Sequence, residues 1–238
     1  RALLGYFPCY SEGNEIVVLD PEDRETELER LYCPRQPKGD RLSLADFYRP
    51  KDSGELDVVA LQAVTAGDEV TELMAKLEAD GEFAERLSPP GLGVQAAEGM
   101  AEWLHWRVRR ALGLGEAQGR RYSWGYPAVP EQSEHLKVEK LLDFSQIGME
   151  LTDGYSPTPE QSTLAMIVHH PQAVYYGMRN GRFLPNGSPD EVIRDTPRDA
   201  TLVRAEVIDT DPIEGAIEDE ALAFGNNARD GERAGAAS

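Results

Sequence analysis

The chain has 238 residues, of which 43 are acidic and 24 are basic, so its formal net charge is −19. It is long enough to bury a sizeable core. Its acidity argues against a role in binding nucleic-acid backbones or anionic membranes, because both roles need clustered Lys and Arg. No apolar run approaches the roughly 20 residues of a transmembrane helix.

The first residues predict a strand, residues 3–7, that is already under way at the start of the sequence. Because residue 1 is Arg and no signal-peptide pattern is visible, we expect a cytoplasmic fragment of a longer chain. The two cysteines, Cys9 and Cys33, form neither a disulfide framework nor a C-x-x-C metal pair. We therefore expect two reduced thiols and no metal site.

The next elements follow from turn residues and periodicity. Residues 12–14 predict a turn, so residues 15–19 should form a hairpin with the opening strand. The β-branched run 56–64 predicts a central strand. Helical spacing then predicts a helix that ends at Gly81, with apolar positions Val70, Leu73, Met74 and Leu77.

The second half continues with a long helix over residues 94–112, which should pack on the sheet through Val94, Ala97, Ala101, Leu104, Val108 and Leu112. A short helix is expected at 136–144, and two paired strands at 163–168 and 173–176. Residues 179–212 predict an extension or a short strand, and 224–238 a disordered tail. Strands interrupted by helices, without βαβ regularity, predict an α+β fold with a mainly antiparallel twisted sheet and packed helices.

The segment 121–130 carries residue types that suit a binding loop. Two prolines, a glycine and three aromatic residues exclude a helix and disfavour a central strand, so we expect a rigid, irregular loop. The guanidinium fork of Arg121 suits a carboxylate or a phosphate. The residues alone favour the alternative, a packing loop with Arg121 in a salt bridge.

Two other clusters each allow a structural and a functional interpretation. Glu98, Glu102 and His105 share one side of the long helix, either as a solvated acidic rim or with a partly desolvated carboxylate facing a cationic ligand. His169 and His170 should point to opposite faces of a strand, so a hairpin turn is favoured over a shared metal. No phosphate loop or G-x-S-x-G motif supports nucleophilic catalysis.

Seven pieces of the sequence, in order and at similar spacing, carry a more specific signal. The most specific is Arg-x-x-x-Gly-Tyr-Pro-Ala-x-Pro at 121–130; the others are residues 5–8 with 11–14, 44–47 with 51–54, 63–67, 97–109, 147–149, and 170–171 with 175–176. Together they resemble the C-terminal activation domain of cobalamin-dependent methionine synthase. The resemblance covers most of the chain up to Tyr176.

The resemblance implies a methyltransferase module that binds S-adenosylmethionine. In that family the sulfonium methyl is offered to cobalamin held by a neighbouring domain, after a flavodoxin-type donor has reduced cob(II)alamin. Arg121 is then expected to bind the methionyl carboxylate, and Glu98 to offset the sulfonium charge. Tyr126 is expected beside the sulfonium as the catalytic residue.

Four further site residues follow from the same resemblance. Ser123 would supply main-chain contacts, and Gly125 would allow close approach of the ligand. Tyr175 and Tyr176 would contact the adenosyl part. An N-terminal helical segment, which in the family contributes an Asp to the ligand, would lie upstream of Arg1.

The resemblance also implies the organisation of the protein. We expect an activation domain at residues 1–180 and a lineage-specific acidic extension at 181–238, largely disordered at its end. Expected partners are the cobalamin-binding domain of the same protein and the flavodoxin-type donor, which an acidic surface would repel unless it docks on a basic patch, Arg107, Arg109, Arg110 and Arg120. The zinc of the family belongs to the homocysteine domain of the full-length enzyme, and the isolated fragment is not expected to be active alone.

Two alternatives come from other classes. The chain could be a non-catalytic docking module for a corrinoid protein or its reductase, since Ser123 stands where the family often has Ala. It could also be a stand-alone activator of another corrinoid methyltransferase. Homocysteine, folate and cobalamin modules upstream of Arg1 would separate the second alternative from methionine synthase.

Overall fold

The computed structural model describes residues 1–80, 88–115, 118–176 and 206–208. The strands are β1 (Ala2–Glu12), β2 (Glu15–Leu19), β3 (Glu27–Tyr32), β4 (Asp57–Thr65), β5 (Arg120–Tyr122), β6 (Glu150–Leu151), β7 (Pro157–Thr158), β8 (Ser162–Val168) and β9 (Glu206–Ile208). The α-helices are α1 (Glu69–Ala79), α2 (Ser88–Ala111) and α3 (His135–Leu142), with short 3-10 helices η1 (Leu44–Phe47), η2 (Lys51–Ser53), η4 (Gln132–Glu134) and η5 (Phe144–Ile147). These elements belong to one compact unit, Arg1–Ile208.

The main sheet is antiparallel, with strand order β3-β2-β1-β4-β8-β5. On one side β1 pairs with β4 along most of its length. On the other side β2 pairs with its C-terminal part and β9 with its first residues. β1 therefore has neighbours on both sides at residues 2–4 and at Cys9, and nine of its eleven residues are buried. The opening strand, the hairpin, the central strand and the antiparallel α+β class are all confirmed.

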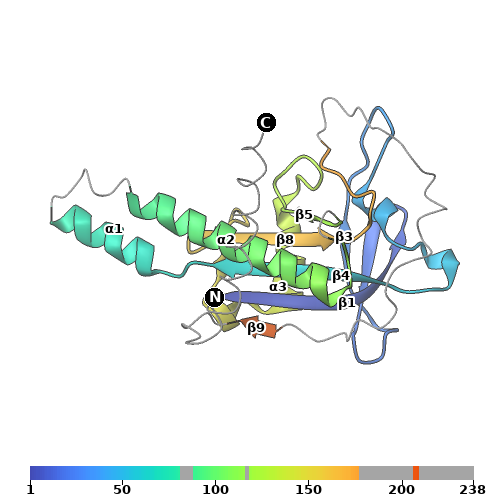
Figure 1. Cartoon of the computed structure of the whole chain (residues 1–238), viewed down its shortest axis with the longest axis horizontal. Helices are drawn as coiled ribbons and strands as arrows, with labels where there is room; N and C mark the ends of the chain where they lie inside the picture. Colours follow the sequence, from blue (N-terminus) through green and yellow to red (C-terminus); the bar gives the residue numbers. More distant parts are fainter. Residues whose placement is uncertain (81–87, 116–117, 177–205, 209–238) are drawn as a thin grey trace, which may run out of the picture. The chain divides into compact units, whose positions relative to one another are not determined.

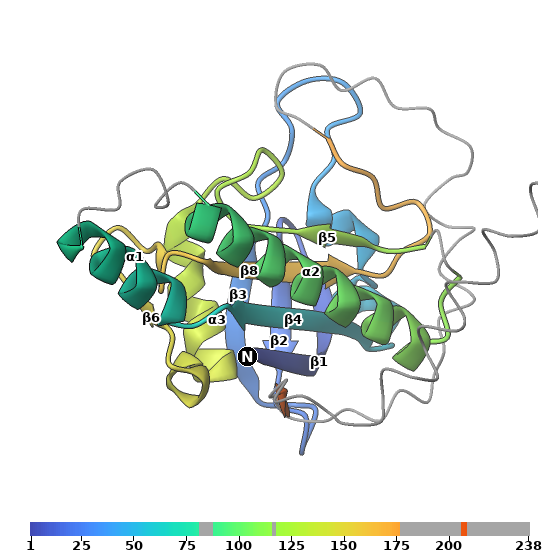
Figure 2. The same ribbon diagram turned by 60° about the vertical axis from the view of Figure 1, so that its left-hand side comes forward.

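The two faces of the sheet are covered by different helices (Figures 1 and 2). One face packs against α2, whose small and branched residues meet β1, β4 and β8 at Leu4, Ala60, Val64 and Ile167. The other face carries the larger core with α3, η1 and η5, which includes Phe7, Leu61, Leu142, Phe144 and Met166. Alternating side chains of the same strands thus feed two separate apolar layers, as strand geometry requires.

Gly5 explains how closely α3 approaches the sheet. A Cβ atom at this position would lie 2.6 Å from a ring carbon of Phe7 and 2.7 Å from a methyl carbon of Leu142. Both distances are far below van der Waals contact. The Gly5-Tyr6-Phe7-Pro8 piece therefore has a packing reason that is independent of any ligand.

The long helix differs in part from its prediction. It begins at Ser88, six residues before the predicted start, and Val94 is 46% exposed. The other five residues of the predicted stripe are buried. Val94 precedes the part of α2 that packs on the sheet, which begins at Ala97. It therefore stays exposed although it fits the helical spacing of the buried stripe.

The strand predicted at residues 173–176 is wrong, because the structure has no strand there. The partners of β8 are β4 and β5 instead. Residues beyond His170 turn back, with the amide of Ala173 donating to the carbonyl of His170 at 3.0 Å. The hydroxyl of Tyr122 donates to the carbonyl of Val174 at 2.6 Å. This carbonyl is therefore bonded by a side chain and not by the backbone of a neighbouring strand.

Other predictions are confirmed with shifted limits or lie outside the described residues. The short helix α3 ends at Leu142, and Phe144 belongs to η5. The segment 179–212, for which the sequence allowed either an extension or a short strand, includes the short strand β9, which pairs with β1. The stop at Gly81, the tail at 224–238 and nearly all of the extension at 181–238 lie outside the described residues.

Among the described residues, no three His, Cys, Asp or Glu side chains lie close enough together to hold a metal ion. Cys9 and Cys33 are buried free thiols whose pKa values burial raises. Nε2 of His169 lies 2.7 Å from Oδ1 of Asp57. Burial opposes ionisation of Asp57, but this hydrogen bond, with the His169 charge and backbone donors, lowers its pKa. The described helices include none that could cross a membrane.

Candidate functional site

A hollow of about 500 Å³ lies where α2, β5 and the start of β8 meet the loop after β5. It is lined by Glu98, Arg121, Tyr122, Ser123, Tyr126, Pro127, Ala128, Thr163, Tyr175 and Tyr176. We call it the α2/β5 hollow. Six of the seven predicted site residues line it, although they come from three distant parts of the sequence.

The segment 121–130 is not wholly a loop, because Arg121 and Tyr122 belong to the edge strand β5. The pairing of Arg121 with Ile167 of β8 fixes the register of Arg121 in the sheet. An edge strand of three residues is compatible with the prolines that follow. The prediction of an irregular loop therefore holds only from Ser123 onwards.

The rest of the loop is anchored in the core. Trp124, Ala128 and Val129 are buried, and the ring of Trp124 meets His135 of α3 edge-on at 5.7 Å. The amide of Val129 donates to the carbonyl of Tyr126 at 3.0 Å, which closes a tight turn. These anchors present Ser123, Tyr126 and Pro127 to the hollow as a pre-formed surface.

Gly125 is the predicted site residue that does not line the hollow. Its φ of 85° lies in the left-handed region, and a Cβ there would lie 2.9 Å from the side-chain nitrogen of Gln132. Its amide also donates to the carbonyl of Val129 at 2.9 Å. The glycine is therefore required by the turn that shapes the loop.

An ion pair between Arg121 and Glu98 forms one wall. Nη2 of Arg121 donates to Oε2 of Glu98 at 2.6 Å, which joins β5 to α2. Nη1 of the same guanidinium is buried and has no hydrogen-bond partner among the described residues. An unpaired charged donor is costly to bury, so this atom is suited to an anionic group that enters the hollow.

His105 lies further along α2, near the same guanidinium. Burial, followed by the positive charges of Arg109, Arg121 and Arg120, lowers its pKa from 6.5 to about 4. Its Nε2 faces Gly119 and has no hydrogen-bond partner in the described part of the chain. The acidic-rim interpretation of Glu98, Glu102 and His105 is therefore wrong for His105, which is a buried neutral imidazole.

The three tyrosines that were predicted as site residues have different environments. Tyr175 is 66% exposed, and its ring packs on Tyr122 with centroids 5.3 Å apart. Tyr176 is buried in the larger core, and burial raises its pKa. Tyr126 is 68% exposed on the loop. Tyr126 and Tyr175 are thus the side chains that a ligand could bury.

Four lining residues were not predicted: Tyr122, Pro127, Ala128 and Thr163. Three of them stand inside the 121–130 motif, so the motif as a whole was a better guide than the residues selected from it. Thr163 is the second residue of β8 and precedes by four residues Ile167, which packs in the layer with α2. Strand alternation could have placed it on this face.

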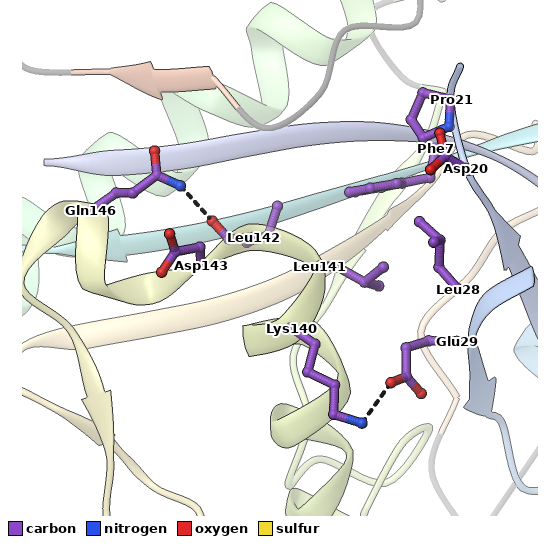
Figure 3. Close-up of a pocket in the computed structure, with 10 residues that line it drawn as sticks. All are labelled: Phe7, Asp20, Pro21, Leu28, Glu29, Lys140, Leu141, Leu142, Asp143 and Gln146. Atoms are coloured by element: carbon purple, nitrogen blue, oxygen red, sulfur yellow. Dashed lines mark hydrogen bonds and ion pairs between the residues drawn. The ribbon is translucent and has the colours of Figure 1, made fainter. Parts of the chain in front are cut away.

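A second hollow of about 510 Å³ lies where α3 and the residues after it meet β1, the end of the β1–β2 hairpin and β3 (Figure 3). We call it the α3/β3 hollow. Its lining includes Phe7, Leu28, Leu141, Lys140 and Glu29. Nζ of Lys140 donates to Glu29 at 2.7 Å, and Gln146 donates to the carbonyl of Leu142 at 3.3 Å. No side chain that lines it has a buried polar atom without a partner in the described residues.

Comparisons with known proteins agree on one family. The family described as vitamin B12 dependent methionine synthase, activation domain, matches residues 1–181. Methionine synthases of Mycobacterium tuberculosis and Mycobacterium leprae are 35% and 34% identical over 198 residues, which cover 73% of this chain. The crystal structure of the MetH reactivation domain bound to AdoHcy superposes with a TM-score of 0.70 and 31% identity, covering 75% of this chain and 61% of that chain.

The fold and the hollow thus define an activation domain of the cobalamin-dependent methyltransferase class. The chain belongs to the family of vitamin B12-dependent methionine synthase activation domains, which confirms the resemblance. It corresponds to only 17% and 16% of the length of the two mycobacterial relatives.

Proposed function

We propose that the α2/β5 hollow binds S-adenosylmethionine and presents its methyl group for reductive methylation of cobalamin in another domain of the same protein. The observation that carries the proposal is the Arg121–Glu98 pair, with a buried guanidinium nitrogen left unpaired beside two exposed tyrosines. A ligand with a carboxylate, a cationic centre and an aromatic base matches these groups. AdoHcy in the related reactivation domain is the product left when such a ligand has lost its methyl group.

Arg121 and Glu98 orient the charged end of the ligand. Nη1 of Arg121 donates a charge-assisted hydrogen bond to the methionyl carboxylate, which supplies its missing partner. Glu98, already held by Nη2, supplies the negative charge that offsets the sulfonium. The Arg121 side chain is mostly buried, so its contact with the carboxylate is stronger than it would be on an open surface, whereas the Glu98 carboxylate is about half exposed and more strongly screened by water.

The aromatic groups hold the rest of the ligand. Tyr126 lies beside the sulfonium as a polar ring next to a cation, and Tyr175 covers the adenosyl part. Tyr176 supports this wall from the core, and Ser123 contributes main-chain groups. Gly125 acts by shaping the loop. These residues position the methyl group, while reduced cobalamin supplies the nucleophile when it is bound.

The other functions of the whole protein belong to parts outside this chain. We assign methyl transfer from methyltetrahydrofolate to homocysteine, and the zinc it uses, to those other domains. Cobalamin is held mainly by its own domain, and a flavodoxin-type protein supplies the electron. Residues 1–180 form the activation domain in this assignment, and residues 181–238 a separate acidic extension.

Isothermal titration with S-adenosylmethionine tests the proposal. We expect saturable binding to the present chain and tighter binding to a chain extended upstream of Arg1, where the family places an additional Asp. S-adenosylhomocysteine should bind too, because it keeps the carboxylate and the adenosyl group. The absence of heat with either chain at millimolar ligand would reject the proposal.

A further inference from the structure

The end of β8 carries a buried ionisable pair that does not line the α2/β5 hollow. Nε2 of His169, the first residue after β8, lies 2.7 Å from Oδ1 of Asp57, the first residue of β4. Only 2% of the His169 side chain and 5% of the Asp57 side chain are exposed. Because desolvation of both groups offsets their attraction, the pair is better explained by the conformation that it specifies than by net stability.

The pair joins two strands beyond the end of their shared backbone ladder. At this end of the sheet, the β4–β8 ladder finishes with Ala60 opposite Ile167. Asp57 lies three residues before Ala60, and His169 lies two residues after Ile167. The side-chain hydrogen bond therefore ties β8 to β4 where their backbones no longer pair.

The Asp57 carboxylate connects three segments of the chain. Its Oδ2 accepts a hydrogen bond from the amide of Arg49 at 3.1 Å, and its Oδ1 also accepts one from the amide of Val58 at 2.8 Å. The ring of His169 packs edge-on against the ring of Tyr48, with centroids 6.0 Å apart. The His169 ring is thus fixed against β4 and against the residues that follow η1.

The main chain of His169 is held as well. Its carbonyl accepts a hydrogen bond from Nε2 of Gln118 at 3.0 Å, and the carbonyl of Gln118 accepts one from Nε of Arg109 at 2.9 Å. The basic patch predicted from the sequence includes Arg109, but this hydrogen bond directs its side chain to the connection between α2 and β5. His169 is therefore fixed both by its ring and by its carbonyl.

Beyond His169 the chain forms a compact turn. The amide of Gln172 donates to Nδ1 of His170 at 3.2 Å, and the amide of Ala173 donates to the carbonyl of His170 at 3.0 Å. The ring of His170 packs on Phe47 of η1, with centroids 5.5 Å apart. In Figures 1 and 2 this segment (orange) runs beside the short 3-10 helices (light blue). A shift of His169 would therefore move the whole turn.

The turn leads into the aromatic wall of the α2/β5 hollow. The hydroxyl of Tyr122 donates to the carbonyl of Val174 at 2.6 Å, and the ring of Tyr175 packs on that of Tyr122. Among the described residues no strand ladder fixes this wall, and Tyr175 itself is largely exposed. The position of Tyr175 therefore depends on the turn that begins at His169.

We propose that Asp57 and His169 are positioning residues for ligand binding, because their buried pair fixes the turn 169–174 and so places Tyr175 over the adenosyl part of the ligand. The inference rests on the proposed function, since only a bound ligand gives Tyr175 this role. A wall that is already in place loses less conformational entropy when the ligand binds. Loss of the pair should therefore lower affinity while the groups that contact the carboxylate and the sulfonium stay unchanged.

The double variant Asp57→Asn/His169→Phe tests the positioning in the full chain. Asparagine still accepts the two backbone amides, and phenylalanine still offers a ring to Tyr48, so the loss is confined to the bond between the pair. Without ligand, the amides of Gln172 and Ala173 should exchange with solvent about tenfold faster in NMR measurements.

Two single variants support this measurement. Asp57→Asn replaces the double variant if circular dichroism shows that the latter is unfolded, and it should accelerate the same two amides by a smaller factor. His169→Gln keeps a donor near the position of Nε2, so it should retain most of the protection. An unchanged exchange rate in the folded double variant would overturn the inference.

S-adenosylmethionine affinity separates positioning from general stability. In calorimetric titration the double variant should bind about fivefold more weakly, and Tyr175→Ala about tenfold more weakly. Combining all three substitutions should cause no further loss than Tyr175→Ala alone, because the pair acts through this ring. A combined loss equal to the product of the separate losses would overturn the inference.

The matched control is Glu29→Gln, which removes the charge of another largely buried carboxylate, paired with Lys140 at the α3/β3 hollow. It should change neither the exchange of the turn amides nor the affinity. Equal acceleration by the control and the double variant would indicate a general loss of stability and would contradict the positioning role.

Failure of the proposed function would look different. A wild-type chain that binds no S-adenosylmethionine would reject that function, whereas faster exchange of the turn in the double variant would still support the placement of Tyr175 by the pair.

Discussion

The two hollows have nearly equal volumes but different chemistry. The α2/β5 hollow contains a buried guanidinium nitrogen without a partner and two exposed tyrosines. In the α3/β3 hollow the cation of Lys140 is already paired with Glu29. The difference teaches that volume alone does not mark a ligand site. A buried charged atom without a hydrogen-bond partner is the more informative signal, because leaving it unpaired destabilises the fold unless a ligand binds there.

The largest expected effect is on ligand binding at Arg121. Arg121→Ala should weaken S-adenosylmethionine binding by about a hundredfold, because the carboxylate loses its charge-assisted donor. Arg121→Lys should recover only part of this loss, since an ammonium cannot provide the same planar fork. Calorimetric titration measures both. Unchanged affinity in Arg121→Ala would place the ligand elsewhere.

A second difference concerns acid stability. The folded-state pKa of His105 is about 4, below its ordinary 6.5, so the unfolded chain binds more protons between these values. Stability from this group is full above pH 6.5 and is lost as the pH falls toward 4, by about 2–3 kcal/mol.

His105→Gln should flatten that part of the stability profile in urea unfolding. His170 provides a matched comparison on the other side of the sheet, because burial also lowers its pKa to about 4. His170→Gln should flatten the same range independently. A profile that does not change in His105→Gln would contradict the buried neutral imidazole.

A substitution at Gly5 should lower the stability of the fold without changing ligand affinity. Gly5→Ala should destabilise the fold by about 1–3 kcal/mol, because the added methyl group meets Phe7 and Leu142 at the α3/β3 hollow. Thermal unfolding measures the loss. S-adenosylmethionine affinity at a temperature where the variant is folded should stay unchanged, and a parallel loss of affinity would link the two hollows.

A substitution at Glu98 should affect the cationic ligand more than its neutral analogue. Glu98→Gln should weaken S-adenosylmethionine binding by about tenfold, because the sulfonium loses its offsetting carboxylate. The affinity for S-adenosylhomocysteine, which has a neutral sulfur, should change less. Equal losses for both ligands would show that Glu98 acts only by positioning Arg121.

The smallest effect is expected at Lys140. Its ammonium is largely exposed in the pair with Glu29, so Lys140→Ala should cost less than about 1 kcal/mol of stability. The affinity for S-adenosylmethionine should not change. A loss of affinity comparable to that of Arg121→Ala would reverse the assignment of the two hollows.

Periodicity was sufficient for the main elements. The β-branched run of β4 and the turn between β1 and β2 are local signals, and the structure forms both elements. Residues 173–176 have a similar apolar character but form no strand. Their conformation depends on Tyr122, about fifty residues earlier, whose hydroxyl donates to the carbonyl of Val174. A local sequence pattern cannot reveal a hydrogen bond from so distant a residue.

The sequence predicted most of the residues that line the α2/β5 hollow, apart from Tyr122, Pro127, Ala128 and Thr163, but not how they are arranged. The motif at 121–130 identified Arg121 and Tyr126, because its residue types are unusual for a helix or a central strand. The Arg121–Glu98 pair joins residues 23 positions apart and depends on β5 lying beside α2. The buried Nη1 atom and the loop-shaping role of Gly125 also arise only from packing.

A crystal structure of the chain with S-adenosylhomocysteine tests the central claim most directly. The account predicts the ligand in the α2/β5 hollow, with its carboxylate on Nη1 of Arg121 and its adenosyl group against Tyr175. A ligand bound in the α3/β3 hollow, or in the α2/β5 hollow without contact to Arg121, would contradict it.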